Sequence, residues 1–138
     1  MQITSYEDLA HFFPRLKVHR YRLPNGFEAW AGRTDQDNDL LSIKVARPDD
    51  WWFHVRGMPG SHLILKAPQG ETPGRDLLKL AAAIAAWHSK ARGGGTVAVA
   101  GTQARYVTKP RGAKAGTVQI RKERIFKVRP KQPDEDGL

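Results

Sequence analysis

The segment Asp50-Trp51-Trp52-Phe53-His54, with the Pro59-Gly60-Ser61-His62 segment that follows it, predicts a β-hairpin at the centre of the fold. Successive side chains of a strand point to opposite faces, so Trp52 and His54 are expected to share a face with Asp50. The opposite face carries the apolar residues typical of a core. Glycine tolerates positive φ and proline presets φ near about −65°, so residues 57–60 predict the turn.

The returning strand is expected over residues 62–66, which places His54 and His62 close together across the hairpin. An acid, an indole and two imidazoles on one face are more than a core requires. We therefore interpret this face as a surface that contacts a ligand. The alternative is that the histidines are structural and bond backbone carbonyls within the hairpin.

The length and composition indicate one domain without cysteine chemistry. A chain of 138 residues is long enough for a single hydrophobic core. It contains no cysteine, which excludes disulfides, thiolate catalysis and cysteine-ligated zinc. No apolar run approaches the ~18 residues of a membrane span, and the N-terminus lacks the features of a signal peptide. We therefore expect a cytoplasmic protein without membrane contact.

The charge is strongly basic and is concentrated towards the C-terminus. Lys and Arg number 23 against 14 Asp and Glu, which gives a net charge of +9 and a pI near 10.2. Between residues 102 and 130 the sequence has nine Lys or Arg and one Glu. Such a segment is typical of proteins that bind phosphate backbones, although a solvated basic surface has the same composition.

Hydrophobic periodicity and capping residues predict three helices. The amphipathic stretch 6–13 predicts a short one, and Thr34 is expected to cap a second over about 35–46. The longest helix is expected over about 73–91, where apolar residues recur at three- and four-residue spacing after a Thr72 cap.

Strand-like segments alternate with these helices and predict an α+β fold. The segments are residues 27–32, 51–55, 62–66, 96–100, 105–107, 117–120 and 125–128. The last two are expected to form a hairpin through residues 122–124. Helices and hairpins interleave without a regular βαβ repeat, so we expect a mixed, mainly antiparallel sheet. We divide the chain into an N-terminal extension with a short helix (1–23), a main domain (24–130) and a disordered tail (131–138).

A catalytic or metal site receives little support from the residue spacing. Asp50, His54 and His62 have side chains used as metal ligands and as general acids and bases, but their spacing fits no metal-binding motif. Ser61 lacks the second glycine and the strand-to-helix setting of a nucleophile elbow. We therefore predict no catalytic residue, no metal site and no cofactor.

The second informative segment is the basic loop over residues 109–116, Lys-Pro-Arg-Gly-Ala-Lys-Ala-Gly. Its glycines and proline expose backbone amides beside Lys109, Arg111 and Lys114, an arrangement suited to holding phosphate groups. The loop lacks the GKS/T ending and the following helix of a Walker loop. The alternative is an ordinary basic turn between two strands.

These motifs together resemble the NFACT-R domain, in order and spacing, over most of the chain from about Trp30 to Pro130. The residues that carry the resemblance are Gly32-Arg33, Asn38, Leu40, Asp50-x-Trp52-x-His54, Pro59-Gly60-Ser61-His62, Ala81, Ser89-Lys90-Ala91 and Val107-x-Lys109-Pro110-x-Gly112-Ala113-Lys114-x-Gly116. In this family the domain is the proposed RNA-binding module of RqcH-type ribosome quality-control factors. Those factors bind obstructed large ribosomal subunits and direct tailing of stalled nascent chains.

The resemblance implies a stand-alone RNA-binding module and not a tail-synthesising enzyme, since the other domains of the family do not fit into 138 residues. The implied partners are transfer RNA, large-subunit ribosomal RNA and the ribosome itself. The expected nucleic-acid contacts are Arg33, Trp52, His54, Arg56, Lys90, Arg105, Lys109, Arg111 and Lys114. Trp52 or His54 is expected to stack on an unpaired base. The motif residues left without a role are Asn38, Asp50, Gly60, Ser61 and His62.

Two other function classes stay open at this point. One is an RNA-processing or RNA-modification enzyme, or an accessory to one, that uses Asp50, His54 and His62. The other is a protein-docking module whose basic face meets an acidic partner. The sequence does not indicate an oligomeric state.

Overall fold

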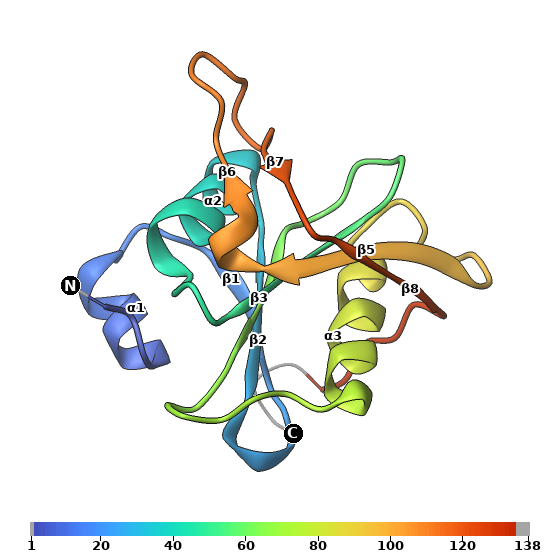
Figure 1. Ribbon diagram of the computed structural model, residues 1–138, viewed down its shortest axis with the longest axis horizontal. Helices are drawn as coiled ribbons and strands as arrows, with labels where there is room; N and C mark the ends of the chain where they lie inside the picture. The colour runs from blue at the N-terminus through green and yellow to red at the C-terminus, as the bar shows by residue number, and fades with distance from the viewer. Residues whose placement is uncertain (1, 135–138) are drawn as a thin grey trace.

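A six-stranded antiparallel sheet forms the centre of the computed structural model, which describes residues 2–134 (Figure 1). Its strands, in their order across the sheet, are β1 (Val18–Arg22), β2 (Glu28–Gly32), β4 (Leu63–Lys66), β3 (Trp51–Val55), β5 (Val97–Gln103) and β8 (Arg124–Val128). Each neighbouring pair is antiparallel. The predicted α+β class is confirmed, and the sheet is antiparallel instead of mixed.

The predicted hairpin is confirmed and occupies the middle of this sheet. β3 and β4 pair with Trp52 opposite Ile64 and Phe53 opposite Leu63. β3 ends at Val55, so the turn falls where it was expected. β5 pairs with the other side of β3, and β2 with the other side of β4.

The helices within the described residues are α1 (Tyr6–Phe12), α2 (Asp35–Asp39), which continues as a π-helical segment over Leu40–Val45, and α3 (Arg75–Trp87). The expected cap of α2 is confirmed, because the Thr34 hydroxyl accepts a hydrogen bond from the backbone N–H of Asp37 at 3.1 Å. None of the described helices has the length and apolarity needed to cross a membrane.

The helix α3 is shorter than the expected 73–91. Its N-cap is Gly74 and not Thr72, so the first turn of the helix has no side-chain cap. At its other end the helix stops before His88, whose carbonyl accepts a hydrogen bond from the backbone N–H of Ser61 at 2.8 Å. The chain that follows α3 is thereby attached to the turn between β3 and β4.

Both faces of the sheet are buried, contrary to the expectation of one open face. One face packs against α3 through a core that includes Phe53 and Ile84. The other face is covered by α1 and the α2 segment, which contribute Leu9 and Leu41 to a second core around Trp52. Trp52 is 3% exposed, so the expectation that its face is an open contact surface is wrong for this side chain.

The C-terminal strands do not form the expected hairpin. β6 (Val107–Thr108) and β7 (Gln119–Ile120) make a separate two-stranded ladder, whereas β8 pairs with β5. Lys122 lies between β7 and β8 with a φ of 54°, a left-handed conformation at the point where the chain passes from the ladder to the main sheet. The strand expected over 105–107 begins as a 3₁₀ turn at Ala104–Tyr106.

Both ends of the described chain make backbone hydrogen bonds to the rest of the fold. Within the expected extension, β1 pairs with β2, and sequence analysis missed this strand because it lacks a clear alternation of apolar and polar residues. At the other end, the backbone N–H of Lys131 donates to the carbonyl of Ala83 on α3 at 3.0 Å. The last four residues of the expected tail, 135–138, lie outside the described residues.

Candidate nucleic-acid interface

A cavity of about 390 Å³ opens beside the end of β3 and the chain that returns from the basic loop. We call it the histidine cavity, and its main lining residues are Trp52, His54, Arg56, His62, Gly116, Thr117, Val118, Ile120 and Glu123. The hairpin supplies one wall and the base of the loop supplies the other. The two most informative sequence motifs therefore meet at one site.

The two histidines of the hairpin lie together, as predicted. The ring centroids of His54 and His62 are 5.4 Å apart, with the rings edge to face at 84°. His54 is partly exposed, and its ring is stacked beside the buried indole of Trp52 at 6.0 Å. Burial lowers the pKa of His54, although the backbone of Gly60 hydrogen-bonds its ring and opposes this shift. The lowered pKa favours the uncharged imidazole, an aromatic ring at the edge of the cavity.

His62 is buried in a hydrogen-bond chain that begins at Trp52. The Trp52 indole Nε1–H donates to the Ser42 hydroxyl at 3.0 Å, and that oxygen lies 2.8 Å from Nδ1 of His62. The Ser42 hydroxyl proton can then point towards Nδ1, an arrangement that favours the neutral imidazole with its proton on Nε2. Burial lowers the pKa of His62 to about 4, and the neighbouring charge of His54 adds to this effect.

This depressed pKa predicts acid sensitivity. Between pH 6.5 and about 4 the unfolded chain binds a proton at residue 62 that the folded chain excludes, so stability is full above pH 6.5 and falls as the pH is lowered to 4. The loss from His62 alone is expected to be about 3 kcal/mol. Urea unfolding of the wild type and of His62→Gln at pH 7 and pH 4.5 measures it. Equal losses in the two proteins would contradict the assignment.

Several motif residues hold the hairpin against α2. The backbone N–H of His62 donates to the side-chain carbonyl of Asn38 at 3.1 Å. A Cβ on Gly32 would lie 2.1 Å from that same oxygen, so only glycine leaves room for Asn38 there. The Ser61 hydroxyl donates to the carbonyl of Gly32 at 2.7 Å. Asn38 and Ser61 thus acquire a role that the sequence left open, namely positioning His62.

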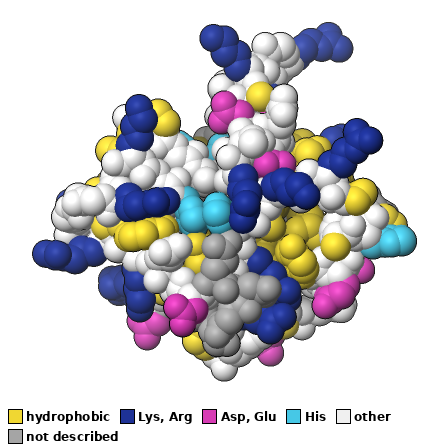
Figure 2. All heavy atoms as spheres, turned by 180° about the vertical axis from the view of Figure 1, so that it is seen from behind, with side chains coloured by type: hydrophobic (Ala, Val, Ile, Leu, Met, Phe, Trp, Pro, Cys, Tyr) yellow, Lys and Arg dark blue, Asp and Glu magenta, His cyan; other side chains and the backbone are white. Residues whose placement is uncertain are grey.

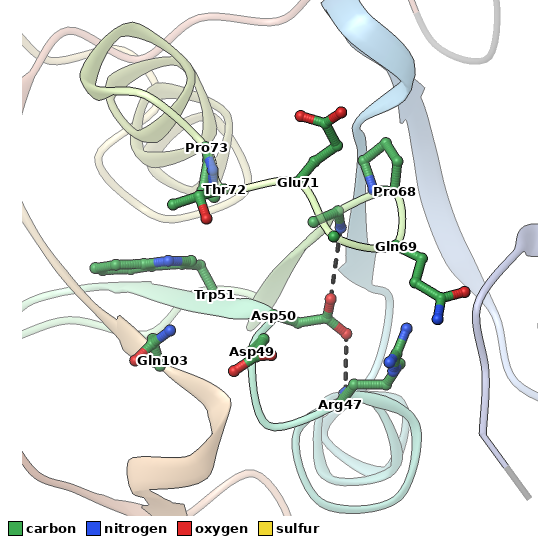
Figure 3. A pocket seen from close by; sticks show the side chains of 12 residues that line it. Arg47, Asp49, Asp50, Trp51, Pro68, Gln69, Glu71, Thr72, Pro73 and Gln103 are labelled. Atoms are coloured by element: carbon green, nitrogen blue, oxygen red, sulfur yellow. Dashed lines mark hydrogen bonds between the residues drawn. The ribbon is translucent and has the colours of Figure 1, made fainter.

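Asp50 does not join the histidines, contrary to the constellation considered above. Its carboxylate accepts hydrogen bonds from Nζ of Lys66 at 2.6 Å and from the backbone N–H of Arg47 at 2.8 Å. Asp50 and Lys66 are each only 3% exposed. Figure 3 shows the Asp50 carboxylate directed between Arg47 and the chain after β4, in a different cavity of about 260 Å³. Asp50 is therefore committed to a buried ion pair.

Lys109 is also engaged within the fold and is not an open phosphate contact. Its Nζ lies 3.1 Å from the Asp39 carboxylate and donates to the carbonyls of Lys114 and, at 3.0 Å, Thr117. The backbone N–H of Gly116 donates to Asp39 as well, at 2.9 Å. These bonds fix the base of the loop beside the π-helical segment. The pairing of Lys109 with Asp39 could not be predicted from the sequence, because the two residues lie 70 positions apart in the chain.

The remaining cations of the loop, Arg111 and Lys114, are exposed. The loop projects from the top of the molecule beyond β6 and β7 (Figure 1), and Figure 2 shows Lys and Arg side chains at the end of this projection. The backbone of Lys114 supports Lys109, whereas its side chain is directed to solvent. Of the three predicted loop cations, two are thus available to a ligand.

The other predicted cations fall into separate groups. Arg56 is exposed at the histidine cavity. Arg105 forms an ion pair with Asp49 and lines another cavity together with Lys109. Arg33 and Lys90 line a different cavity, together with Arg92, which the sequence analysis missed. The only sequence signal for Arg92 was its position next to the Ser89-Lys90-Ala91 motif.

Comparison with known proteins identifies the family. Residues 17–122 match the family described as NFACT protein RNA binding domain. The chain belongs to this family. The matched segment includes β1, the whole hairpin, the basic loop and every lining residue of the histidine cavity named above except Glu123.

Individual relatives agree with this assignment. The chain is 34% identical over 113 residues to the Rqc2 homolog RqcH of Bacillus subtilis (strain 168), a match that covers 82% of this chain and 19% of that protein. It is 32% identical over 134 residues to the Rqc2 homolog RqcH of Streptococcus suis (strain 05ZYH33), covering 92% of this chain and 23% of the relative. The NFACT-R chain thus spans about a fifth of the length of these proteins.

A solved structure shares the fold. It is that of the C-terminal part of the fibronectin/fibrinogen-binding protein from Streptococcus suis, with a TM-score of 0.78 and 29% sequence identity. The match covers 92% of this chain and 55% of the solved one.

Within the described residues, no group of three or more His, Cys, Asp or Glu side chains is placed to hold a metal ion.

Proposed function

We propose that this NFACT-R chain is a non-enzymatic RNA-binding module that contacts transfer RNA or large-subunit ribosomal RNA during ribosome rescue or quality control in the cytoplasm. The observation that carries the proposal is the histidine cavity, which joins an accessible aromatic ring to a projecting cationic loop. RNA recognition commonly combines these two elements, a stacking surface for an unpaired base and cations for the backbone. The relatives named as RqcH support the ribosomal setting.

In this account the two walls of the cavity have different tasks. His54 stacks on an unpaired base and is supported from below by Trp52, which is too enclosed to do so itself. Arg111 and Lys114 hold phosphates at the end of the loop, and Arg56 continues the positive charge at the rim. Lys109 keeps the loop in place through Asp39. The division accounts for the exposed and the ion-paired members of the basic motif.

The loop assignment predicts a change in the salt dependence of binding. Each phosphate contact contributes about 0.7–0.9 to the slope of log affinity against log salt, so Arg111→Ala/Lys114→Ala should reduce the magnitude of the slope by about 1.4–1.8. Fluorescence anisotropy with labelled transfer RNA over a series of KCl concentrations measures this. Arg75→Ala/Lys79→Ala removes equal charge from exposed positions of α3 and should have a smaller effect. Equal slopes for the two double variants would refute the loop assignment.

A further inference from the structure

A second cavity, of about 350 Å³, shares no lining residue with the histidine cavity. Three segments that are distant in the sequence form it: the start of α2, the turn between β3 and β4, and the chain that follows α3. The residues used below are Arg33, Thr34, Ser61, Ser89, Lys90 and Arg92. We call this site the arginine cavity.

The main chain fixes the shape of the arginine cavity. The backbone N–H of Ser61 donates to the carbonyl of His88, and the backbone N–H of Lys90 donates to the carbonyl of Pro59 at 3.2 Å. Gly60 and Ser89 form an isolated β-bridge, and a Cβ on Gly60 would lie 2.8 Å from the Cβ of Ser89. The approach is thus close enough to require glycine. The cationic residues after α3 are held in place and do not belong to a freely moving loop.

The cavity is positively charged. Among the described residues, the cations Arg33, Lys90 and Arg92 line it with one carboxylate, Asp35. Asp35 lies beside the base of the basic loop, since a Cβ on Gly116 would be 3.0 Å from its Oδ1. Arg92 is held by Trp87, since its Nε donates to the Trp87 carbonyl at 2.7 Å and its guanidinium lies 4.7 Å from the indole centroid. Two of the three cations are arginines, whose planar guanidinium groups suit oxyanions.

The cations of the arginine cavity also act on the buried His88, which lines it. Its Nε2 lies 2.5 Å from the hydroxyl of Tyr21, and its ring is stacked on His19 at 4.5 Å. Burial lowers the pKa of His88 to about 4, and the charges of His19, Arg92 and Arg33 act in the same direction. The cations therefore repel a further positive charge at the edge of the cavity, and the same field attracts an anion.

We propose that the arginine cavity binds a phosphate group through the side chains of Arg33, Lys90 and Arg92. The hydroxyl protons of Thr34, Ser61 and Ser89 are donated within the fold, so these residues shape its walls. Phosphate is the chemistry that an RNA backbone and a free or terminal phosphate monoester share. As a site for an RNA phosphodiester, the inference rests on the proposed function. As a site for a phosphate monoester, it stands apart from that function.

Titration of the uniformly ¹⁵N-labelled full chain with inorganic phosphate, at constant ionic strength, tests the site by two-dimensional NMR. Saturable amide shifts are expected for Thr34, Ser61 and residues 89–92. Lys90→Glu should weaken this response at least about tenfold, because a carboxylate replaces one of three cations. Lys79→Glu makes the same substitution on the exposed face of α3 and should leave the response unchanged. The spectra themselves report whether each variant is folded.

The absence of saturable shifts at these residues, or equal weakening in both variants, would overturn the phosphate site. Competition by a trinucleotide without terminal phosphates would identify an RNA phosphodiester as the ligand, and binding of monoesters alone would identify a free or terminal phosphate. Wild-type protein that binds phosphate here but binds neither transfer RNA nor large-subunit ribosomal RNA would refute the proposed function and leave the site standing. Transfer RNA binding without the phosphate response would refute only the site.

Discussion

Replacing Asp50 with alanine is expected to lower the free energy of unfolding by about 3–5 kcal/mol. The substitution leaves Lys66 buried, at 3% exposure, without its carboxylate partner at 2.6 Å. It also removes the acceptor for the backbone N–H of Arg47. Burial already lowers the pKa of Lys66, and Asp50 is the main influence that opposes this shift. An unpaired buried ammonium is much less stable than a buried pair.

Urea denaturation at pH 7, followed by circular dichroism, measures this loss. Asp49→Ala is the matched control, because it breaks the exposed Arg105–Asp49 pair, in which the Asp49 side chain is 80% exposed. That change is expected to lower stability by only about 0–1 kcal/mol. The double variant Asp50→Ala/Lys66→Met should recover part of the loss, since it removes both charges. A loss below about 1 kcal/mol in Asp50→Ala would contradict the structural role given to this residue.

His54→Ala is expected to weaken RNA binding by about 1–3 kcal/mol, the usual effect of losing one stacked base. His54 is partly exposed at the histidine cavity and its ring lies parallel to Trp52 within 25°. Its removal therefore takes away a contact surface and leaves the buried Trp52–Ser42–His62 chain intact. Anisotropy with transfer RNA gives the affinity, and circular dichroism shows whether the fold is retained.

The conservative variant separates stacking from acid–base chemistry. His54→Phe keeps an aromatic ring and should retain most of the affinity, whereas an enzyme that uses the imidazole would lose activity with His54→Phe and keep its RNA affinity. Unchanged affinity in a folded His54→Ala protein would refute the stacking role. Asp50 gives the enzyme hypothesis no support, because its carboxylate is bonded to Lys66 and lies in another cavity.

The sequence predicted correctly those elements whose stability depends on residues close together in the chain. The β3–β4 hairpin and the Thr34 cap of α2 each depend on residues that lie within a short stretch of chain. β1 was missed because its residues show only a weak strand pattern, and the strand forms through its pairing with β2. Which strand β8 would join was also not predictable, since both β5 and β7 were available in sequence terms.

Part of the candidate site was likewise predictable from residues close together in the chain, and part was not. The proximity of His54 and His62 followed from a two-residue alternation and a short turn. The burial of Trp52 did not, because α1 and the α2 segment close over its face from elsewhere in the chain. Lys109 looked like an open cation for the same reason, since Asp39 reaches it only in the folded protein. Charge patterns identify cations, and the fold decides which are engaged within the protein.

The central claim is that this NFACT-R domain binds RNA at the ribosome, and crosslinking the protein to RNA in the cells that produce it tests that claim most directly. Sequencing of the attached RNA is expected to recover transfer RNA or a discrete patch of large-subunit ribosomal RNA. His54→Ala protein, expressed at the same level, should recover less of the same RNA. A diffuse profile that follows transcript abundance would contradict the claim, and would mean that the net charge of +9 binds polyanions without selection.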